Sequence, residues 1–362
     1  MTDRDALYAA VLAAPDDDTP RLVYADYLDD TGVRADGIRA RFIRNQVALA
    51  RAEPWSEEYD QLFRDTDPVE VHYRKAWVTG IDGIVIPDGN AFERGFLGRV
   101  TCFSKRFVAD GAKLFDLHPV RGVKFAKMNS ARGAATAAEL AASPLLGRLH
   151  TVHLSGRAVD DAYVSAVGQS PHAAGVRSLT LGDCGATAVT VGRFGGRCFP
   201  GLRELELWNV LYGTTDAKAV AKSRSLAALT ALRVCHGGEA ADVPLRGPGA
   251  VALAESPHLR GLVELELRNQ ELRKKGAEAF AAAFVWPGLK RLGLRGNGIP
   301  ASALPAFAAN PRLAALSVLD LRGNDVKGDD LGPLRAAFPR LRVLTDDREQ
   351  PVRLALLPED EP

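Results

Sequence analysis

The stretch Leu289–Asn297, LKRLGLRGN, returns 27 residues later as Leu316–Asn324, LSVLDLRGN. Both copies place leucine at the first, fourth and sixth positions and asparagine at the ninth. Because side chains alternate along a strand, the leucines at positions four and six predict a short strand with one face in a core. An internal repeat of this length predicts a solenoid, in which each unit covers the apolar side of its neighbour.

The pattern L-x-x-L-x-L-x-x-N resembles the leucine-rich repeat. When each unit is indexed by its second apolar residue, the pattern extends over ten units with spacings of 23 to 33 residues. The ten central residues are Val100, Val123, Val152, Leu179, Leu205, Leu232, Leu265, Leu292, Leu319 and Leu344.

Prolines recur in the same phase and predict where the segment before each strand ends, because proline cannot continue a helix. Pro144, Pro171, Pro257 and Pro311 each lie eight residues before a central residue, and Pro200, Pro287 and Pro339 lie five residues before one.

Alanine-rich segments between the strands predict one helix per unit. They include Ala134–Ala142, Ala158–Val167, Gly249–Glu255 and Gly276–Phe284. The expected fold class is therefore α/β: a leucine-rich-repeat horseshoe with a parallel sheet on its concave side and helices on its convex side. Units of 26 to 29 residues resemble the ribonuclease-inhibitor type of this repeat.

The ninth position of the motif is expected to hydrogen-bond backbone groups where each strand turns into a loop. Asparagine occupies it in the two copies quoted above, whereas other units carry Gln270, Cys184, Arg157 and Val210. The units centred on Leu205 and Leu232 and the first units are therefore degenerate copies.

The first 51 residues lie outside the repeat and predict three helices, over Asp5–Ala14, from Thr19 to Leu28, and over Asp36–Arg51. Thr19 is expected to cap the second helix, with Pro20 in its first turn. The stretches Leu12–Gly32, LAAPDDDTPRLVYADYLDDTG, and Arg41–Arg51, RFIRNQVALAR, resemble the bacterial repeat-companion domain. That resemblance implies a small helical module ahead of leucine-rich repeats and implies no activity.

Residues 52–95 are expected to join the module to the solenoid. A charged helix is predicted over Trp55–Trp77, and a hairpin over Ile81–Phe96 with its turn at Pro87–Asn90. We interpret the hairpin as the cap that the first repeat requires. The predicted domains are thus a module at 1–51, a linker and cap at 52–95, a solenoid at 96–350 and a tail at 351–362.

Composition narrows the function classes. The chain has 362 residues, with 46 Lys and Arg against 45 Asp and Glu, and its net charge of +1 argues against a nucleic-acid or anionic-membrane surface. No run of 18 apolar residues is present, and an acidic N-terminus is unlike a signal peptide, so a cytoplasmic protein is expected. The scattered cysteines Cys102, Cys184, Cys198 and Cys235 predict buried thiols.

No motif demands catalysis, a cofactor or a metal. The acidic cluster Asp16, Asp17, Asp18, Asp26, Asp29 and Asp30 is typical of helix caps and a solvated face. His150 and His153 are three apart on a strand and face opposite sides, and Gly192–Arg197 lacks the spacing of a phosphate loop.

The concave face remains as the candidate binding surface. Its predicted partner-binding residues are Glu204, Glu206, Trp208, Arg233, Glu264, Glu266, Arg268, Arg291, Arg295, Asp320 and Arg322. Tryptophan and arginine are frequent interface anchors. The competing interpretation is a solvated sheet face on which these charges neutralise one another.

The sequence therefore predicts a non-enzymatic protein–protein interaction scaffold that binds a protein through its concave face. One alternative is a regulator of a partner nucleotide hydrolase, similar to a GTPase activator, that uses the exposed arginines. A third hypothesis places enzyme chemistry in the acidic N-terminal module.

Overall fold

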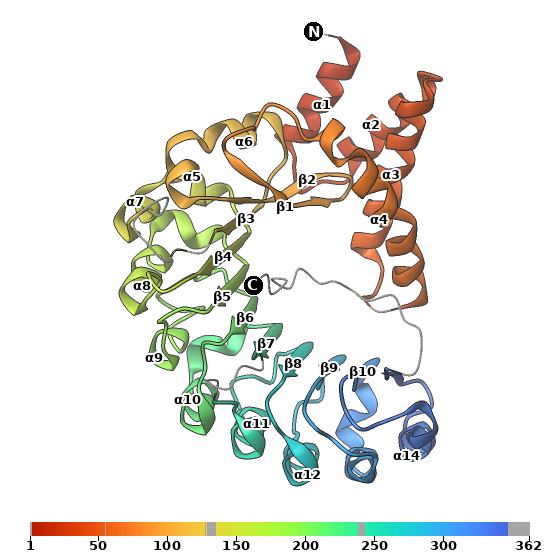
Figure 1. Ribbon diagram of the computed structural model, residues 1–362, viewed down its shortest axis with the longest axis vertical. Helices are drawn as coiled ribbons and strands as arrows, with labels where there is room; N and C mark the ends of the chain where they lie inside the picture. The colour runs from red at the N-terminus through yellow and green to blue at the C-terminus, as the bar shows by residue number, and fades with distance from the viewer. Residues whose placement is uncertain (1, 55, 127, 129–134, 238–242, 347–362) are drawn as a thin grey trace.

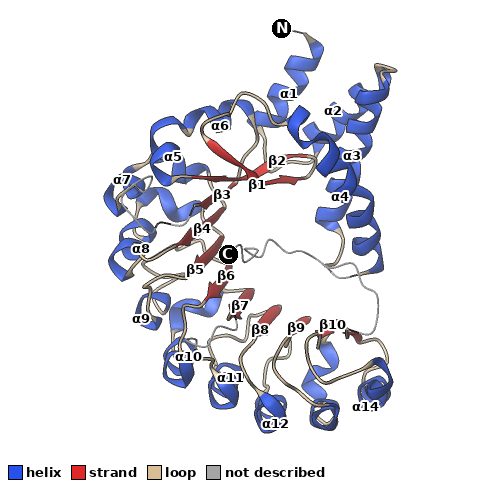
Figure 2. Cartoon of the chain, viewed as in Figure 1, coloured by secondary structure: helices blue, strands red, loops and turns tan. Residues whose placement is uncertain are grey.

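The computed structural model describes residues 2–54, 56–126, 128, 135–237 and 243–346, and for residues 87–90 it describes the backbone alone. It confirms an α/β solenoid whose strands line the inner side of a horseshoe and whose helices lie outside (Figures 1 and 2). The described strands form one sheet in chain order: β1 (Val85–Glu93), β2 (Phe96–Cys102), β3 (Gly122–Phe125), β4 (Thr151–Ser155), β5 (Ser178–Gly182), β6 (Glu204–Trp208), β7 (Ala231–Cys235), β8 (Glu264–Arg268), β9 (Arg291–Gly293), β10 (Val318–Asp320) and β11 (Arg342–Leu344).

Strand register follows the predicted repeat index. From β2 onward all neighbours are parallel, and each predicted central residue from Val100 to Leu292 pairs with the central residue of the next unit. The index was wrong in the last unit, where Leu319 pairs with Val343 and Leu344 pairs with Asp320. Val343 and Leu344 are both apolar, so the alternation that fixes register in other strands is missing there.

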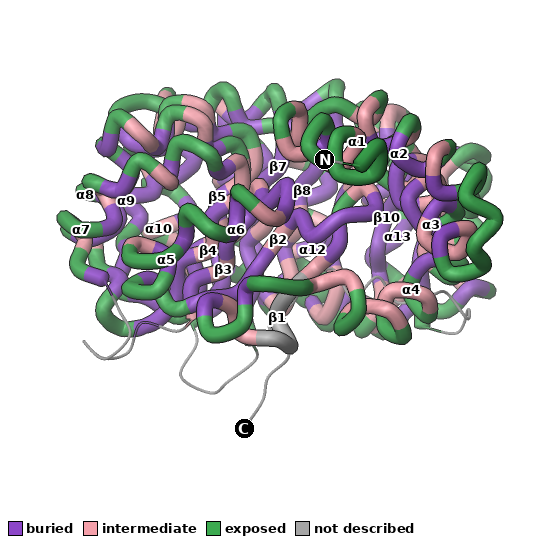
Figure 3. Tube along the Cα trace, turned by 90° about the horizontal axis from the view of Figure 1, so that it is seen from above, coloured by how far each residue is buried: buried purple, intermediate pink, exposed green. Residues whose placement is uncertain are grey.

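Helices and short 3₁₀ turns cover the convex side of the sheet. The helices are α5 (Ser104–Asp110), α6 (Ala112–Leu117), α7 (Ala137–Ala142), α8 (Asp161–Gly168), α9 (Ala188–Val191), α10 (Gly213–Ala221), α11 (Arg246–Ala254), α12 (Arg273–Ala283), α13 (Leu304–Ala308) and α14 (Gly332–Ala337). One continuous apolar core runs between sheet and helices from Ile81 to Val343, and Figure 3 colours the buried residues purple along the chain. The leucines of motif positions four and six lie in this core, as predicted.

The amides at motif position nine form a buried hydrogen-bond ladder. Asn297 donates to the carbonyl oxygens of Leu267, Leu294 and Arg295 and accepts from the Gln270 N–H. Asn324 and Gln270 repeat this arrangement one unit later and one unit earlier. The predicted backbone role of this position is confirmed in these three units.

Four helices precede the sheet: α1 (Asp3–Ala13), α2 (Thr19–Asp30), α3 (Arg34–Arg51) and α4 (Glu57–Trp77). A small core of their own includes Val11, Tyr24 and Ile43, and Phe96 of β2 joins it. The predicted cap at Thr19 was wrong by position. Thr19 is already helical, and the Asp17 carboxylate accepts the Thr19 N–H at 2.8 Å.

The hairpin of β1 and β2 turns at Arg94-Gly95, which corrects the predicted turn at Pro87–Asn90. Both turn residues have positive φ, 52° and 83°, as a tight hairpin turn requires. Pro87–Asn90 lies within β1, where the pairing with β2 shifts register. As predicted, the hairpin places an antiparallel strand on the open edge of the first repeat.

All four cysteines are buried free thiols, as predicted. Within the described ranges, no helix is both long and apolar enough to cross a lipid bilayer. The predicted tail at 351–362, the solenoid end at 347–350, Ala134 and Trp55 lie outside the described residues.

Candidate partner-binding surface

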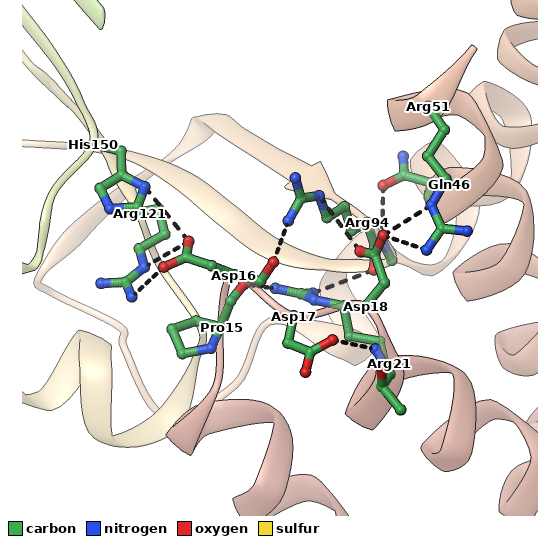
Figure 4. A network of polar contacts seen from close by, with 12 residues as sticks. Pro15, Asp16, Asp17, Asp18, Arg21, Gln46, Arg51, Arg94, Arg121 and His150 are labelled. Carbon is green, nitrogen blue, oxygen red and sulfur yellow. Dashed lines mark hydrogen bonds and ion pairs between the residues drawn. The ribbon is translucent and has the colours of Figure 1, made fainter. Parts of the chain in front are cut away.

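The acidic motif at residues 15–18, which follows α1, holds the N-terminal module against the first repeats. Arg121, at the entry to β3, donates from Nε and Nη2 to the Asp16 carboxylate at 3.2 and 2.8 Å, and His150 Nδ1 lies 3.5 Å from the same carboxylate. Figure 4 shows Asp16 pointing toward both residues. Asp16 is 53% exposed, as predicted for a solvated face, and it also forms a contact between elements that the sequence did not predict.

Further contacts in Figure 4 tie the same motif to the hairpin turn. Arg94 donates to the Asp16 carbonyl oxygen at 2.9 Å, and Arg21 donates to the Pro15 and Arg94 carbonyl oxygens at 2.7 and 3.3 Å. Arg51 donates twice to the Asp18 carboxylate, at 3.0 and 2.7 Å. The motif is thus a structural junction between module, cap and solenoid.

On the concave face, most predicted carboxylates and arginines are paired with one another. Arg233 Nε lies 2.5 Å from Glu264 Oε1, and Arg291 Nε lies 2.9 Å from Glu264 Oε2. Burial opposes the charge on Glu264, yet the two arginines hold its pKa below the usual range. Arg322 likewise forms a two-pronged contact with Asp320, at 2.9 and 2.6 Å. These residues satisfy one another, as the neutralised-sheet interpretation predicts.

Three of the predicted charged residues, Arg268, Arg295 and Glu266, have no hydrogen-bond or ion-pair partner among the described residues. Arg268 ends β8 and Arg295 lies in the turn just after β9, and the bond from Asn269 N–H to the Arg295 carbonyl oxygen places the two positions in adjacent units. Neither guanidinium has a hydrogen bond or ion pair to another described residue. Burial and the neighbouring Arg268 and Arg322 lower the pKa of Arg295. The Arg268 guanidinium lies over the Trp208 ring, 5.4 Å from its centroid.

The contact between Arg268 and Trp208 depends on the residue between them. Cys235 of β7 pairs with both Trp208 and Arg268, and its small side chain is buried. The long side chains on either side therefore meet above it. Trp208 is 8% exposed, and its Nε1 donates to Glu206 at 2.5 Å. We call Trp208, Arg268 and Arg295 the cationic face.

Glu266 is the third predicted charged residue that has no partner among the described residues. It lies next to Arg233 in register, but Arg233 directs its Nε to Glu264. Burial, followed by the charges of Glu206, Glu264 and Asp320, raises the pKa of Glu266 to about 7, and Arg233 only partly offsets this. The concave face therefore offers an unpaired carboxylate beside two unpaired cations.

Replacing Glu266 with glutamine is expected to stabilise the protein at pH 8 by about 1–3 kcal/mol, and to have little effect near pH 4.5. The folded protein binds a proton at Glu266 more tightly than the unfolded chain does, because its pKa is raised. Stability therefore falls as the pH rises from the ordinary carboxyl pKa of 4.5 to about 7. Urea unfolding at the two pH values measures the difference. The exposed Glu255→Gln is the control, and an equal gain at both pH values would contradict the assignment.

Two contacts that the sequence did not predict reach this face from the N-terminal side. Glu53, before α4, lies 3.1 Å from Arg291, and Asp60 in α4 lies 2.7 Å from Arg342. Composition gave no signal for them because they join residues 238 and 282 positions apart. Among the described residues, no group of three or more His, Cys, Asp or Glu side chains could hold a metal ion.

No family model and no curated protein matches the chain. Among solved structures, it is similar to that of the Rad7 and Elc1 complex in yeast, with 13% identity, a TM-score of 0.43, and 87% of this chain and 91% of that chain covered. It is also similar to an internalin, inlF, of Listeria monocytogenes, with 13% identity, a TM-score of 0.35, and 64% and 62% covered. The fold assignment rests on the sheet register, and the resemblance of residues 12–51 to the repeat-companion domain stays a prediction.

Proposed function

We propose that this chain is a non-enzymatic protein-interaction scaffold that binds a protein partner at the cationic face. The observation that supports this best is the adjacent pair Arg268 and Arg295, which meets no anion in the described part of the chain. Like charges held side by side on a partly buried surface cost free energy. A partner's carboxylate that binds between them would lower this cost by neutralising both. Trp208 adds a rigid aromatic surface beside them.

The eleven predicted residues take different parts in this proposal. Glu204, Arg233, Glu264, Arg291, Asp320 and Arg322 pair internally and fix the shape of the surface. Arg268, Arg295 and Glu266 are left to meet a partner. We therefore expect the partner to present a carboxylate to the two arginines and a hydrogen-bond donor to Glu266.

The test compares the full chain with its Arg268→Glu/Arg295→Glu variant as bait in native lysate, followed by titration of each protein that only the wild type captures. We expect the variant to bind at least about tenfold more weakly, because two attractive contacts become repulsive. Arg224→Glu/Arg312→Glu is the matched control, since both arginines are exposed and lie in 3₁₀ turns ahead of the sheet strands. Equal affinities for both variants would contradict the proposal.

A regulator of a partner nucleotide hydrolase is the second candidate. Arg295 favours it, because an unpaired and partly exposed guanidinium is the group that contacts phosphate oxygens. Phosphate release by candidate GTPases, measured with wild type and with Arg295→Ala, separates the two functions. Unchanged release in the presence of the wild type excludes this candidate for each GTPase tested.

A further inference from the structure

The open side of the horseshoe is crossed by the linker and α4. Figure 1 shows α3 and α4 running side by side from the N-terminal strands toward the C-terminal strands. Two ion pairs complete the crossing: Glu53 with Arg291 of β9, and Asp60 with Arg342 of β11. The chain is therefore closed into a ring by contacts between its first and last quarters.

The two ends of this bridge are held in different ways. At the N-terminal end, apolar packing of Tyr24 and Ile43 against Phe96 fixes the module to the sheet. At the C-terminal end, two ion pairs join described residues. The side chain of Glu53 is 57% exposed and that of Asp60 13%, so solvent and salt reach the first pair more easily than the second. A contact of this kind opens far more readily than an apolar core.

Arg291 is the first residue of β9, and Arg342 is the first residue of β11. Each contacts a carboxylate, Arg291 that of Glu53 before α4 and Arg342 that of Asp60 in α4. Val318 of β10, which separates them, pairs in register with both. Arg291 donates from Nε to Glu264 and from Nη1 to Glu53, so only its Nη1 serves the crossing. The two arginines are thus positioned by the sheet and are occupied by the chain's own acidic segment.

We propose that Glu53 and Asp60 form a reversible clasp that closes the horseshoe, and that an acidic segment of the protein partner takes their place on Arg291 and Arg342 when the clasp opens. The second half rests on the proposed function. We expect the partner segment to be acidic because the segment of this chain that contacts the two arginines is acidic. Its first helical turn also carries Glu57 and Glu58. In the closed state, Glu53 and Asp60 cover the C-terminal strands. When the clasp opens, these strands become accessible to the partner next to the cationic face.

Opening is measured on the full chain with spin labels at Asp67→Cys in α4 and Ser317→Cys before β10. Both positions are exposed, and the native thiols are buried, so the labels attach selectively. We expect one narrow distance in the wild-type background and a longer, broader distribution in Glu53→Arg/Asp60→Arg. The charge swap Asp60→Arg/Arg342→Asp is expected to restore a narrower distribution than Asp60→Arg alone.

The matched control is Glu57→Arg/Glu58→Arg, which makes the same change of charge one turn away on side chains that are exposed. It is expected to keep the wild-type distance. An unchanged distance in Glu53→Arg/Asp60→Arg, or equal widening in the control, would overturn the clasp. Neither result bears on Arg268 and Arg295, so failure of the clasp is distinguishable from failure of the proposed function.

The exchange is tested with a synthetic peptide that has the sequence of residues 52–61, AEPWSEEYDQ. We expect it to bind Glu53→Arg/Asp60→Arg at least about tenfold more tightly than it binds the wild type, whose site is occupied. A peptide with glutamine in place of its residues 53 and 60 is expected to lose this preference. Absence of binding to the opened variant, or equal binding of the two peptides, would overturn the exchange.

Discussion

Replacing Asn297 with alanine is expected to lower the free energy of unfolding by about 3–5 kcal/mol. The Asn297 side chain is 1% exposed and holds four backbone groups, three carbonyl oxygens and the Gln270 N–H. Removing the amide leaves the Gln270 N–H without its acceptor and takes one donor from each carbonyl, although the Leu294 and Arg295 carbonyls keep donors in Asn324 and Asn269. A buried polar group left without a partner costs about 1–3 kcal/mol. The small cavity left by the amide adds to the loss.

Asn45→Ala is the matched control, since Asn45 lies on the partly exposed side of α3 and its side chain makes no hydrogen bond to a described residue. It is expected to change stability by less than about 0.5 kcal/mol. Urea unfolding of both variants measures the difference. If Asn297→Ala lost no more than the control, the ladder would not be what holds successive units together.

The repeat could be predicted because its physical cause is local. Leu292 and Leu294 lie two positions apart in one unit, and Leu319 and Leu321 repeat this apolar alternation in the next unit. Register failed only at Val343 and Leu344, where alternation is absent. The hairpin turn was misplaced because Pro87–Asn90 has turn-forming composition, whereas the turn itself depends on positive φ at Arg94 and Gly95.

The candidate surface was predictable in part for the same reason. Strand alternation assigns Glu266, Arg268 and Arg295 to the concave side, but it cannot assign partners. Whether Arg233 pairs with Glu264 or with Glu266 depends on neighbouring strands and on side-chain geometry. Contacts such as Asp16 with Arg121 and Asp60 with Arg342 join residues 105 and 282 positions apart, and no local pattern encodes them.

Replacing Trp286 with alanine is expected to lower the free energy of unfolding by about 3–5 kcal/mol, and to do so locally. Trp286 is fully buried between α12 and β9, packs against Phe284 at 5.2 Å between ring centroids, and donates from Nε1 to the Ser256 carbonyl oxygen at 3.2 Å. Because a repeat contacts chiefly its neighbours, the loss should concentrate in the units around β8, β9 and β10. Hydrogen exchange is expected to rise there while amides in β4 and β5 stay protected.

Trp208→Ala makes the same change on the concave face and serves as the control. Trp208 lies outside the continuous core between sheet and helices, and one side of its ring meets Arg268 where Trp286 has apolar neighbours. We therefore expect its loss to cost about 1–2 kcal/mol, with exchange in α12 unchanged. Since the same substitution removes part of the cationic face, Trp208→Ala should weaken partner binding while Trp286→Ala, at a temperature where it stays folded, should not. Equal losses of stability, or equal losses of binding, would show that core and binding surface are not separated as the strand alternation places them.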